Sequence, residues 1–418
     1  MVDAFGVVMQ MPPKNVLRNL SRAGRRPKRA RETLRLEHAR RFVNEIYGPD
    51  LHTLRVLSLG NALAGLLNAA VLSVAAIGQA YAQMAHIKGK SGIKQVDRLL
   101  SNGGISLDQV LTAWVRHVVG DHPSIVVALD WTDFDDDDHS TLCAHLVTTH
   151  GRAMPLAWKT VKKSKLAGKR TDYERELLDR LYLMLGTTVR VTLLADRGFG
   201  DQKLYALLRG YGWDYIIRFR EAILVEFEDE RLPASKWVAP NGRARLLAGA
   251  RVTADRAEVG AVVTVKAKRM KEAWCLATSF STLKAQDVVK MYDRRFTIEE
   301  TFRDTKDLNF GMGLRATHIR DADRRDRMLL LVAMAHTLLT LLGAASEACG
   351  MDAYIKANTV KRRTHSLFRQ GLIWYQGLPN MREDWLERLI TAYDKIVRDH
   401  AFFSYVFALK GPVPDAAK

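Results

Sequence analysis

Two apolar runs in the first half of the chain each lead directly into an aspartate. Residues 125–129 are all apolar and precede Asp130, and residues 189–195 are predominantly apolar and precede Asp196. Short apolar runs bounded by turn residues are typical of strands buried on both faces of a sheet. The pattern therefore predicts two buried strands with a carboxylate at the carboxyl end of each.

Other predicted elements alternate around these two runs. We expect strands at residues 142–149, 153–159 and 215–220, and helices at 171–185 and 203–210. The pattern of residues 221–280 then predicts strands only, and the pattern of residues 286–307 strongly predicts a helix. Alternation of this kind indicates a mixed α/β domain, which a β-rich insertion interrupts before its last helix.

The overall charge is strongly positive. Lys and Arg total 64 against 46 Asp and Glu, which gives a net charge of +18 and a pI near 9.8. Such an excess attracts polyanions, so nucleic acid is the first candidate partner and an anionic membrane surface the second. A basic soluble protein without such a partner remains the simpler alternative.

A membrane protein is not expected. The uncharged stretch 56–85 contains four amide side chains, and the apolar stretch 328–342 is too short for a span. The N-terminus lacks the pattern of a signal peptide. Three widely spaced cysteines, without zinc-binding spacing, suit a reducing compartment. We therefore predict a soluble cytoplasmic protein.

A basic segment lies near the N-terminus. It spans residues 14–41, and its cations include Arg25, Arg26, Lys28 and Arg29. Gly24 and Pro27 break the segment, so it should begin as an arm and become helical after the proline. We expect these cations to contact DNA; a solvated charged surface on an ordinary helical bundle is the alternative.

The chain is accordingly expected to have five regions. These are a basic arm with a helical DNA-binding domain (1–121), the first part of the α/β core (122–220), the β-rich insertion (221–282), the last helices of the core (283–345) and a helical C-terminal region (346–418).

Asp130 and Asp196 occupy positions that suit metal-assisted chemistry on phosphodiesters. That chemistry needs acidic side chains that converge on two divalent ions about 3.5–4 Å apart. The carboxyl end of a buried strand is a rigid support for such ligands. An aspartate that merely caps a turn is the alternative for each residue. The acidic run at 133–138 is expected to be a solvated cluster.

The helical segment 286–307 supplies a third carboxylate. At about 100° per residue, an apolar stripe forms beside a polar one, and Glu300 points towards solvent. The apolar stripe comprises Met291, Ile298 and Phe302, and the polar stripe comprises Tyr292, Arg295, Glu299 and Lys306. The polar stripe offers hydrogen-bond donors and positive charge suited to phosphates. An ordinary amphipathic helix with ion pairs would show a similar pattern.

The spacing of the polar stripe resembles a known signature. Tyr292, two residues, Arg295, three residues, Glu299, six residues and Lys306 are similar to the Y-R-E-K signature of cut-and-paste transposases in insertion sequence family four. Residues 129–132 and 195–199 resemble the first two acidic motifs of that family. Residues 298–304 and 311–315 resemble the branch that includes the Tn-ten transposase.

The resemblance implies a fold, a chemistry and partners. The fold would be an RNase H-like catalytic core with the β-rich insertion, flanked by helical domains that bind terminal inverted repeats. Asp130, Asp196 and Glu299 would hold two Mg²⁺ ions, with Mn²⁺ as a substitute. The enzyme would nick one strand, form a hairpin on the element's end, reopen it and join the end to target DNA, as a homodimer on double-stranded DNA.

Trp274 matches the tryptophan that stacks a flipped base in this family. Core packing is the alternative for a tryptophan in a strand. We therefore predict a DNA transposase associated with the bacterial nucleoid. Another RNase H-like nuclease would not need the tyrosine, arginine and lysine of the stripe. A non-catalytic DNA-binding regulator would not need the three carboxylates.

Overall fold

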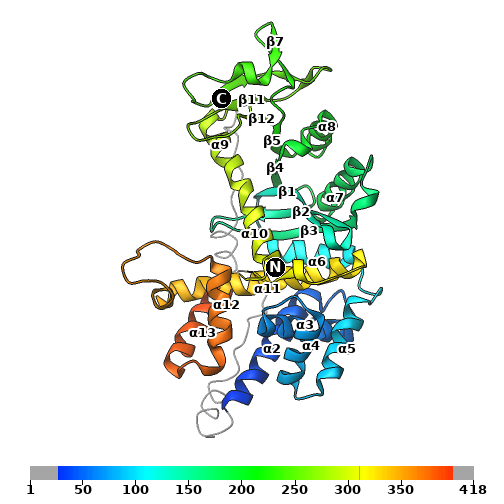
Figure 1. Ribbon diagram of the computed structural model, residues 1–418, viewed down its shortest axis with the longest axis vertical. Coiled ribbons are helices and arrows are strands. Elements are labelled where there is room, and N and C mark those ends of the chain that lie inside the picture. The colour runs from blue at the N-terminus through cyan, green and yellow to red at the C-terminus, as the bar shows by residue number, and fades with distance from the viewer. Residues whose placement is uncertain (1–26, 310, 399–418) are drawn as a thin grey trace, which may run out of the picture. The chain divides into compact units, whose positions relative to one another are not determined.

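The computed structural model describes residues 27–309 and 311–398, which fall into two compact units (Figure 1). An α/β unit comprises residues 118–302. A helical unit combines the described residues of 27–117 with those of 303–398, so it is built from both ends of the chain.

An eight-stranded mixed sheet forms the centre of the α/β unit. Its strand order is β3-β2-β1-β4-β5-β12-β11-β8, in which β1, β4 and β5 are parallel and all other neighbours antiparallel. The strands are β1 (Ser124–Phe134), β2 (His139–Val147), β3 (Ala153–Lys162), β4 (Arg190–Ala195), β5 (Asp214–Phe219), β8 (Arg245–Ala248), β11 (Ala261–Val265) and β12 (Trp274–Thr278). The first six residues of β1 are buried, as an uninterrupted apolar run predicts.

Helices lie against this sheet. On one side are α7 (Arg170–Leu185) and α8 (Gln202–Gly210), which connect β3 to β4 and β4 to β5 (Figure 1). On the other side are α9 (Ala285–Asp293) and α10 (Thr297–Lys306). The predicted helix at 286–307 is therefore not continuous, because a 3₁₀ turn, η5 (Arg294–Phe296), separates α9 from α10.

The segment 221–282 contains strands and one short 3₁₀ helix, η4 (Ala234–Trp237). Four of its strands form a second sheet in the order β10-β9-β6-β7. They are β6 (Leu224–Phe227), β7 (Glu230–Pro233), β9 (Arg251–Val252) and β10 (Ala257–Glu258). The other three strands, β8, β11 and β12, extend the large sheet beyond β5.

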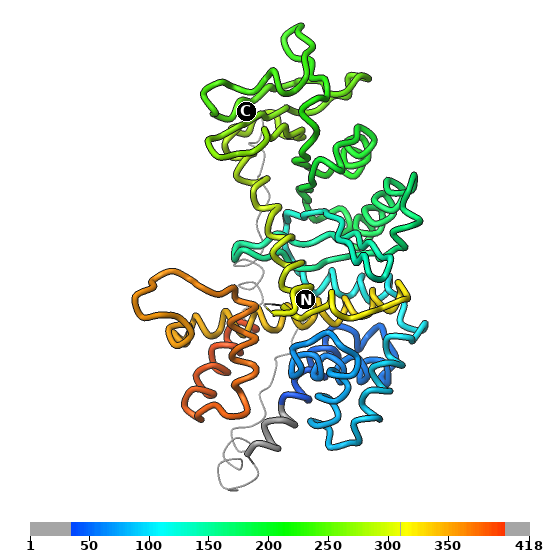
Figure 2. Tube along the Cα trace, viewed as in Figure 1, coloured from blue at the N-terminus to red at the C-terminus, as the bar shows by residue number. Residues whose placement is uncertain are grey.

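The helical unit is organised around one long apolar helix. Its helices are α2 (Pro27–Tyr47), α3 (Thr53–Ala69), α4 (Val74–Ala85), α5 (Gly89–Leu100), α6 (Leu107–Val119), α11 (Ala322–Ala348), α12 (Leu367–Gly377) and α13 (Glu383–Arg398). The side chain of Asp321 caps the start of α11 by accepting a hydrogen bond from the Arg324 N–H. From there α11 packs against α3 and α5 from the N-terminal segment and against α12 and α13 (Figure 2).

The helix α11 is long and apolar enough to cross a membrane. The helices α3 and α4, which are bent relative to each other, are also long and apolar enough when taken together. The helix is longer than the apolar run 328–342 on which the sequence-based expectation rested. However, 83% of its apolar window is buried. Burial of that extent is typical of the core helix of a soluble protein.

Candidate active site

The strand register brings Asp130 and Asp196 to the same edge of the sheet. In the parallel pair of β1 and β4, Leu129 lies beside Ala195, and each aspartate is the next residue. Asp196 follows β4, as predicted. Asp130 does not follow β1 but lies inside it, because β1 continues to Phe134 in antiparallel pairing with β2. The carboxyl edge of these parallel strands therefore carries two adjacent aspartates.

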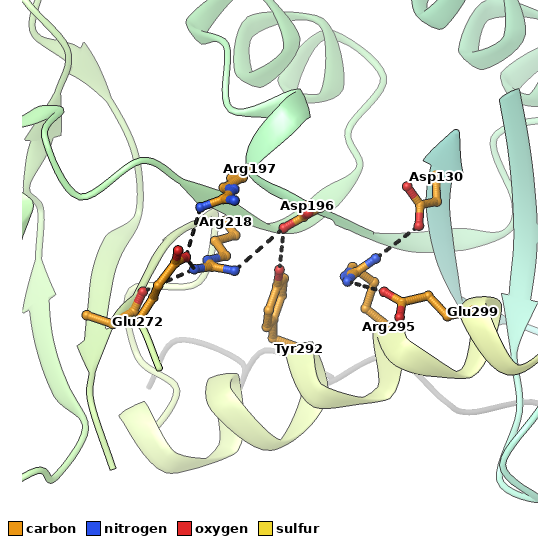
Figure 3. A network of polar contacts seen from close by, with 9 residues as sticks. Asp130, Asp196, Arg197, Arg218, Glu272, Tyr292, Arg295 and Glu299 are labelled. Carbon is orange, nitrogen blue, oxygen red and sulfur yellow. Dashed lines mark hydrogen bonds and ion pairs between the residues drawn. The ribbon is translucent and has the colours of Figure 1, made fainter. Parts of the chain in front are cut away.

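One guanidinium joins the first aspartate to the glutamate (Figure 3). Arg295 Nη1 lies 3.2 Å from Asp130 Oδ2, and Arg295 Nη2 lies 2.7 Å from Glu299 Oε1. The arginine stands in the 3₁₀ turn η5 and is only 3% exposed. Glu299, one turn further along, is exposed. The helix thus places its carboxylate beside Asp130 by way of a buried cation.

A tyrosine and a second arginine contact the other aspartate. The Tyr292 hydroxyl donates a hydrogen bond of 3.4 Å to Asp196 Oδ1, and Arg218 Nη1 lies 4.0 Å from the same oxygen. Burial raises the pKa of the Tyr292 hydroxyl well above its usual range, so it remains a donor at neutral pH. Tyr292, Arg295 and Glu299 of the predicted polar stripe therefore lie together with both aspartates.

Asp130 has a perturbed acidity. Burial raises the pKa of its carboxyl to about 6. The Arg295 guanidinium and the Trp131 backbone N–H oppose this rise, while the charges of Glu299 and Asp196 add to it. A carboxyl that is costly to ionise without further positive charge is typical of functional sites.

A second polar network adjoins Asp196 and was not predicted from the sequence. Arg218 Nη2 and Arg197 Nη1 each lie 2.8 Å from Glu272 Oε2 (Figure 3). Arg197 directly follows Asp196, but Arg218 and Glu272 lie 54 residues apart in the chain. The only local signal is that Glu272 stands two residues before Trp274.

Trp274 packs against the helical side of this network. Its ring makes an edge-on contact with Tyr292, with centroids 5.0 Å apart, and a tilted contact with Phe296 at 5.9 Å. The tryptophan is half-buried and begins β12. Trp274 therefore makes packing contacts of the kind expected for a core residue, and it also remains partly exposed to solvent.

Lys306 and the basic arm are two further predicted features. Lys306 is the last residue of α10 and is half-buried. Arg25 and Arg26 lie outside the described residues, as do the side chains of Lys28 and Arg29 at the start of α2.

Glu300, which was expected to point towards solvent, has a side chain that is 36% exposed, and its Oε2 lies 3.6 Å from Arg152 Nη1. The acidic run at 133–138 is also more than a solvated cluster. Lys163 Nζ lies 2.8 Å from Asp133 Oδ2 and also contacts Asp135, and the Ser164 backbone N–H donates to Asp138. Local cations and donors thus neutralise both features.

The carboxylates suit a divalent cation in type but not in their present spacing. Asp130, Asp196 and Glu299 offer the hard oxygen donors that Mg²⁺ and Mn²⁺ prefer. Within residues 27–309 and 311–398, however, no group of three or more His, Cys, Asp or Glu side chains converges closely enough to hold a metal ion. At this site the Arg295 guanidinium contacts two of the three carboxylates, those of Asp130 and Glu299.

One family model matches the part of the chain that contains this site. The family model described as "Transposase DDE domain" matches residues 122–338, more than half of the chain. The match begins just before β1 and ends within α11, so it covers both aspartates, Glu299 and the whole network of Figure 3. No curated protein matches the chain. The chain belongs to the transposase DDE domain family.

Proposed function

We propose that this protein is the transposase of an insertion sequence and that Asp130, Asp196 and Glu299 are its catalytic carboxylates. One observation carries the proposal. The residues that resemble the Y-R-E-K signature contact both strand-edge aspartates, since Arg295 binds Asp130 and Tyr292 binds Asp196. An ordinary amphipathic helix would have no reason to direct its polar stripe at two aspartates from other elements.

The proposed fold of the catalytic core is RNase H-like. The order β3-β2-β1-β4-β5, with three antiparallel strands followed by two parallel additions, supports it. In this proposal residues 221–282 are the insertion between the second aspartate and the glutamate. The proposed relatives are the cut-and-paste transposases of insertion sequence family four.

The proposed cofactors are two Mg²⁺ ions, for which Mn²⁺ can substitute, held by Asp130, Asp196 and Glu299. When bound, such ions activate a water molecule or a 3′-hydroxyl and stabilise the leaving oxygen. The raised pKa of Asp130 supports this assignment, because a carboxyl that ionises reluctantly gains most from added positive charge.

The neighbouring residues are proposed to hold the DNA. Tyr292, Arg295 and Lys306 supply donors and positive charge for phosphates. Trp274 is proposed to stack a base that has left the duplex, which hairpin formation at the element's end requires. The partners are the terminal inverted repeats and target DNA, bound by a homodimer.

The test is a cleavage assay with the ends of the chain's own element and Mg²⁺, which resolves nicked, hairpin and joined products. Asp130→Asn, Asp196→Asn and Glu299→Gln should each abolish cleavage and leave binding to the ends nearly intact. Glu300→Gln is the matched control on the same helix and should remain active. Full cleavage by any of the first three variants contradicts the assignment.

A further inference from the structure

The helix pair α4 and α5 is packed at backbone distance within the helical unit. Three residues, 86–88, join the two helices. A Cβ added to Gly78 would lie 2.4 Å from Ile93 Cα, and one added to Gly92 would lie 2.2 Å from the Gly78 carbonyl oxygen. The preceding helix, α3, is bent by 101° from α4. Two closely packed helices joined by a three-residue turn are one feature of a helix-turn-helix.

The outward face of α5 carries a row of cations. Lys90, Lys94 and Arg98 follow one another at intervals of four residues, and all three are exposed. At about 100° per residue, this row lies opposite the buried face of the helix. None of the three side chains forms an ion pair or a hydrogen bond within the described part of the chain. Their charges are therefore available to an external partner.

The single acidic residue of α5, Asp97, forms an ion pair with a residue of the core helix α11. Arg324 Nη2, in α11, lies 2.8 Å from Asp97 Oδ1. Arg327 Nη1, one turn later, donates 2.9 Å to the Leu100 carbonyl oxygen at the end of α5. These contacts anchor α5 on the core helix and pair Arg324 with Asp97, which remains exposed beside the row of cations.

We propose that α5 is the helix that this protein lays in the major groove of double-stranded DNA, with Lys90, Lys94 and Arg98 on phosphates. The inference rests on the proposed function for the identity of the polyanion. An exposed helix fits the major groove in width, and phosphate contacts set its position. The outward row contains no large apolar side chain, which a membrane-binding helix requires.

The experiment measures binding apart from cleavage. The full chain is titrated, with EDTA present, onto a fluorescent mixed-sequence duplex of about 30 base pairs over a range of NaCl concentrations. Lys90→Gln, Lys94→Gln and Arg98→Gln together should weaken binding at least about tenfold and lower the slope of log affinity against log salt by about 2–3. The matched control replaces Lys203, Lys236 and Arg243 by glutamine, which removes the same charge from exposed positions of the α/β unit.

A second duplex tests the groove. Cytosines that carry glucosylated 5-hydroxymethyl groups fill the major groove, so the wild-type chain should bind this duplex at least about tenfold more weakly, and the α5 variant should show little further loss. Equal effects of the two triple variants, an unchanged salt slope or equal affinity for both duplexes would overturn the proposal. Weak binding by an α5 variant whose thermal melt is unchanged excludes misfolding as the cause. If the wild-type chain binds no duplex at all, the proposed function itself fails.

Discussion

The guanidinium of Arg295 should compete with a divalent cation for the carboxylates of Asp130 and Glu299. Its removal by Arg295→Gln is therefore expected to tighten the binding of Mn²⁺ to the DNA-free protein. Most arginine substitutions at an active site would be expected only to impair it, so the direction of this effect is informative.

The contacts set the expected size of the effect. A cation that enters must displace hydrogen bonds of 3.2 Å to Asp130 and 2.7 Å to Glu299. Hydrogen bonds to charged groups contribute about 1.5–3 kcal/mol each, but the Glu299 side chain is 50% exposed, which weakens the second contact. We therefore expect about 1.5–3 kcal/mol in total, or about a 10- to 100-fold lower Kd for Mn²⁺.

The assay follows free Mn²⁺ by electron paramagnetic resonance during titration of the protein without DNA. Arg218→Gln is the matched control, because Arg218 lies 4.0 Å from Asp196 and 2.8 Å from Glu272 but contacts neither Asp130 nor Glu299 in Figure 3. Asp130→Asn combined with Arg295→Gln should bind no Mn²⁺ at this site. An unchanged or higher Kd for Arg295→Gln would refute the reasoning, whereas tight binding that survives Asp130→Asn would place the ion elsewhere.

Three further predictions concern Asp130, the basic arm and Trp274. Because the pKa of Asp130 is raised from 3.8 to about 6, its ionisation costs folding free energy above pH 6 and nothing below pH 3.8. In EDTA, Asp130→Asn should therefore stabilise the protein at pH 8, on the order of 1–3 kcal/mol, and this gain in thermal or denaturant melts should vanish towards pH 4. Deletion of residues 14–31 should weaken DNA binding and flatten its salt dependence; an unchanged slope would mean that the arm does not contact phosphates. Trp274→Ala should slow hairpin formation on the order of 10- to 100-fold and spare the first nick, as time courses of both products can show. Equal loss of both products, with a lower Tm, would make Trp274 a packing residue beside Tyr292.

The strands around the site could be predicted from local pattern, but their full length could not. The apolar run 125–129 correctly indicates a buried strand, yet β1 continues for five more residues. Three of these five residues are polar, and all five pair with β2 across the turn at residues 135–138. The end of the apolar run does not reveal this pairing, so Asp130 was expected after the strand rather than within it.

Some contacts of the site could likewise be predicted from the sequence, and others could not. Tyr292, Arg295 and Glu299 were grouped correctly because their spacing suits one helix face, although the 3₁₀ turn at Arg295 was missed. Arg218 and Glu272 were missed because they meet across 54 residues of chain and carry no motif of their own. The ion pair of Glu300 with Arg152 was not predicted either, because Arg152 lies far away in the sequence.

The helical unit is assembled from the two ends of the chain, and this arrangement sets an order of events during synthesis. The N-terminal helices through α6 leave the ribosome about 200 residues before α11, the helix on which α3 and α5 pack. At about 5–20 residues per second, this interval lasts about 10–40 s. All strands of the α/β unit precede α11 in the chain, so its sheet can form within that time. A chain that terminates before α11 would therefore carry these strands but expose the apolar surfaces of α3 and α5 that pack on α11, and cellular proteases should remove it rapidly.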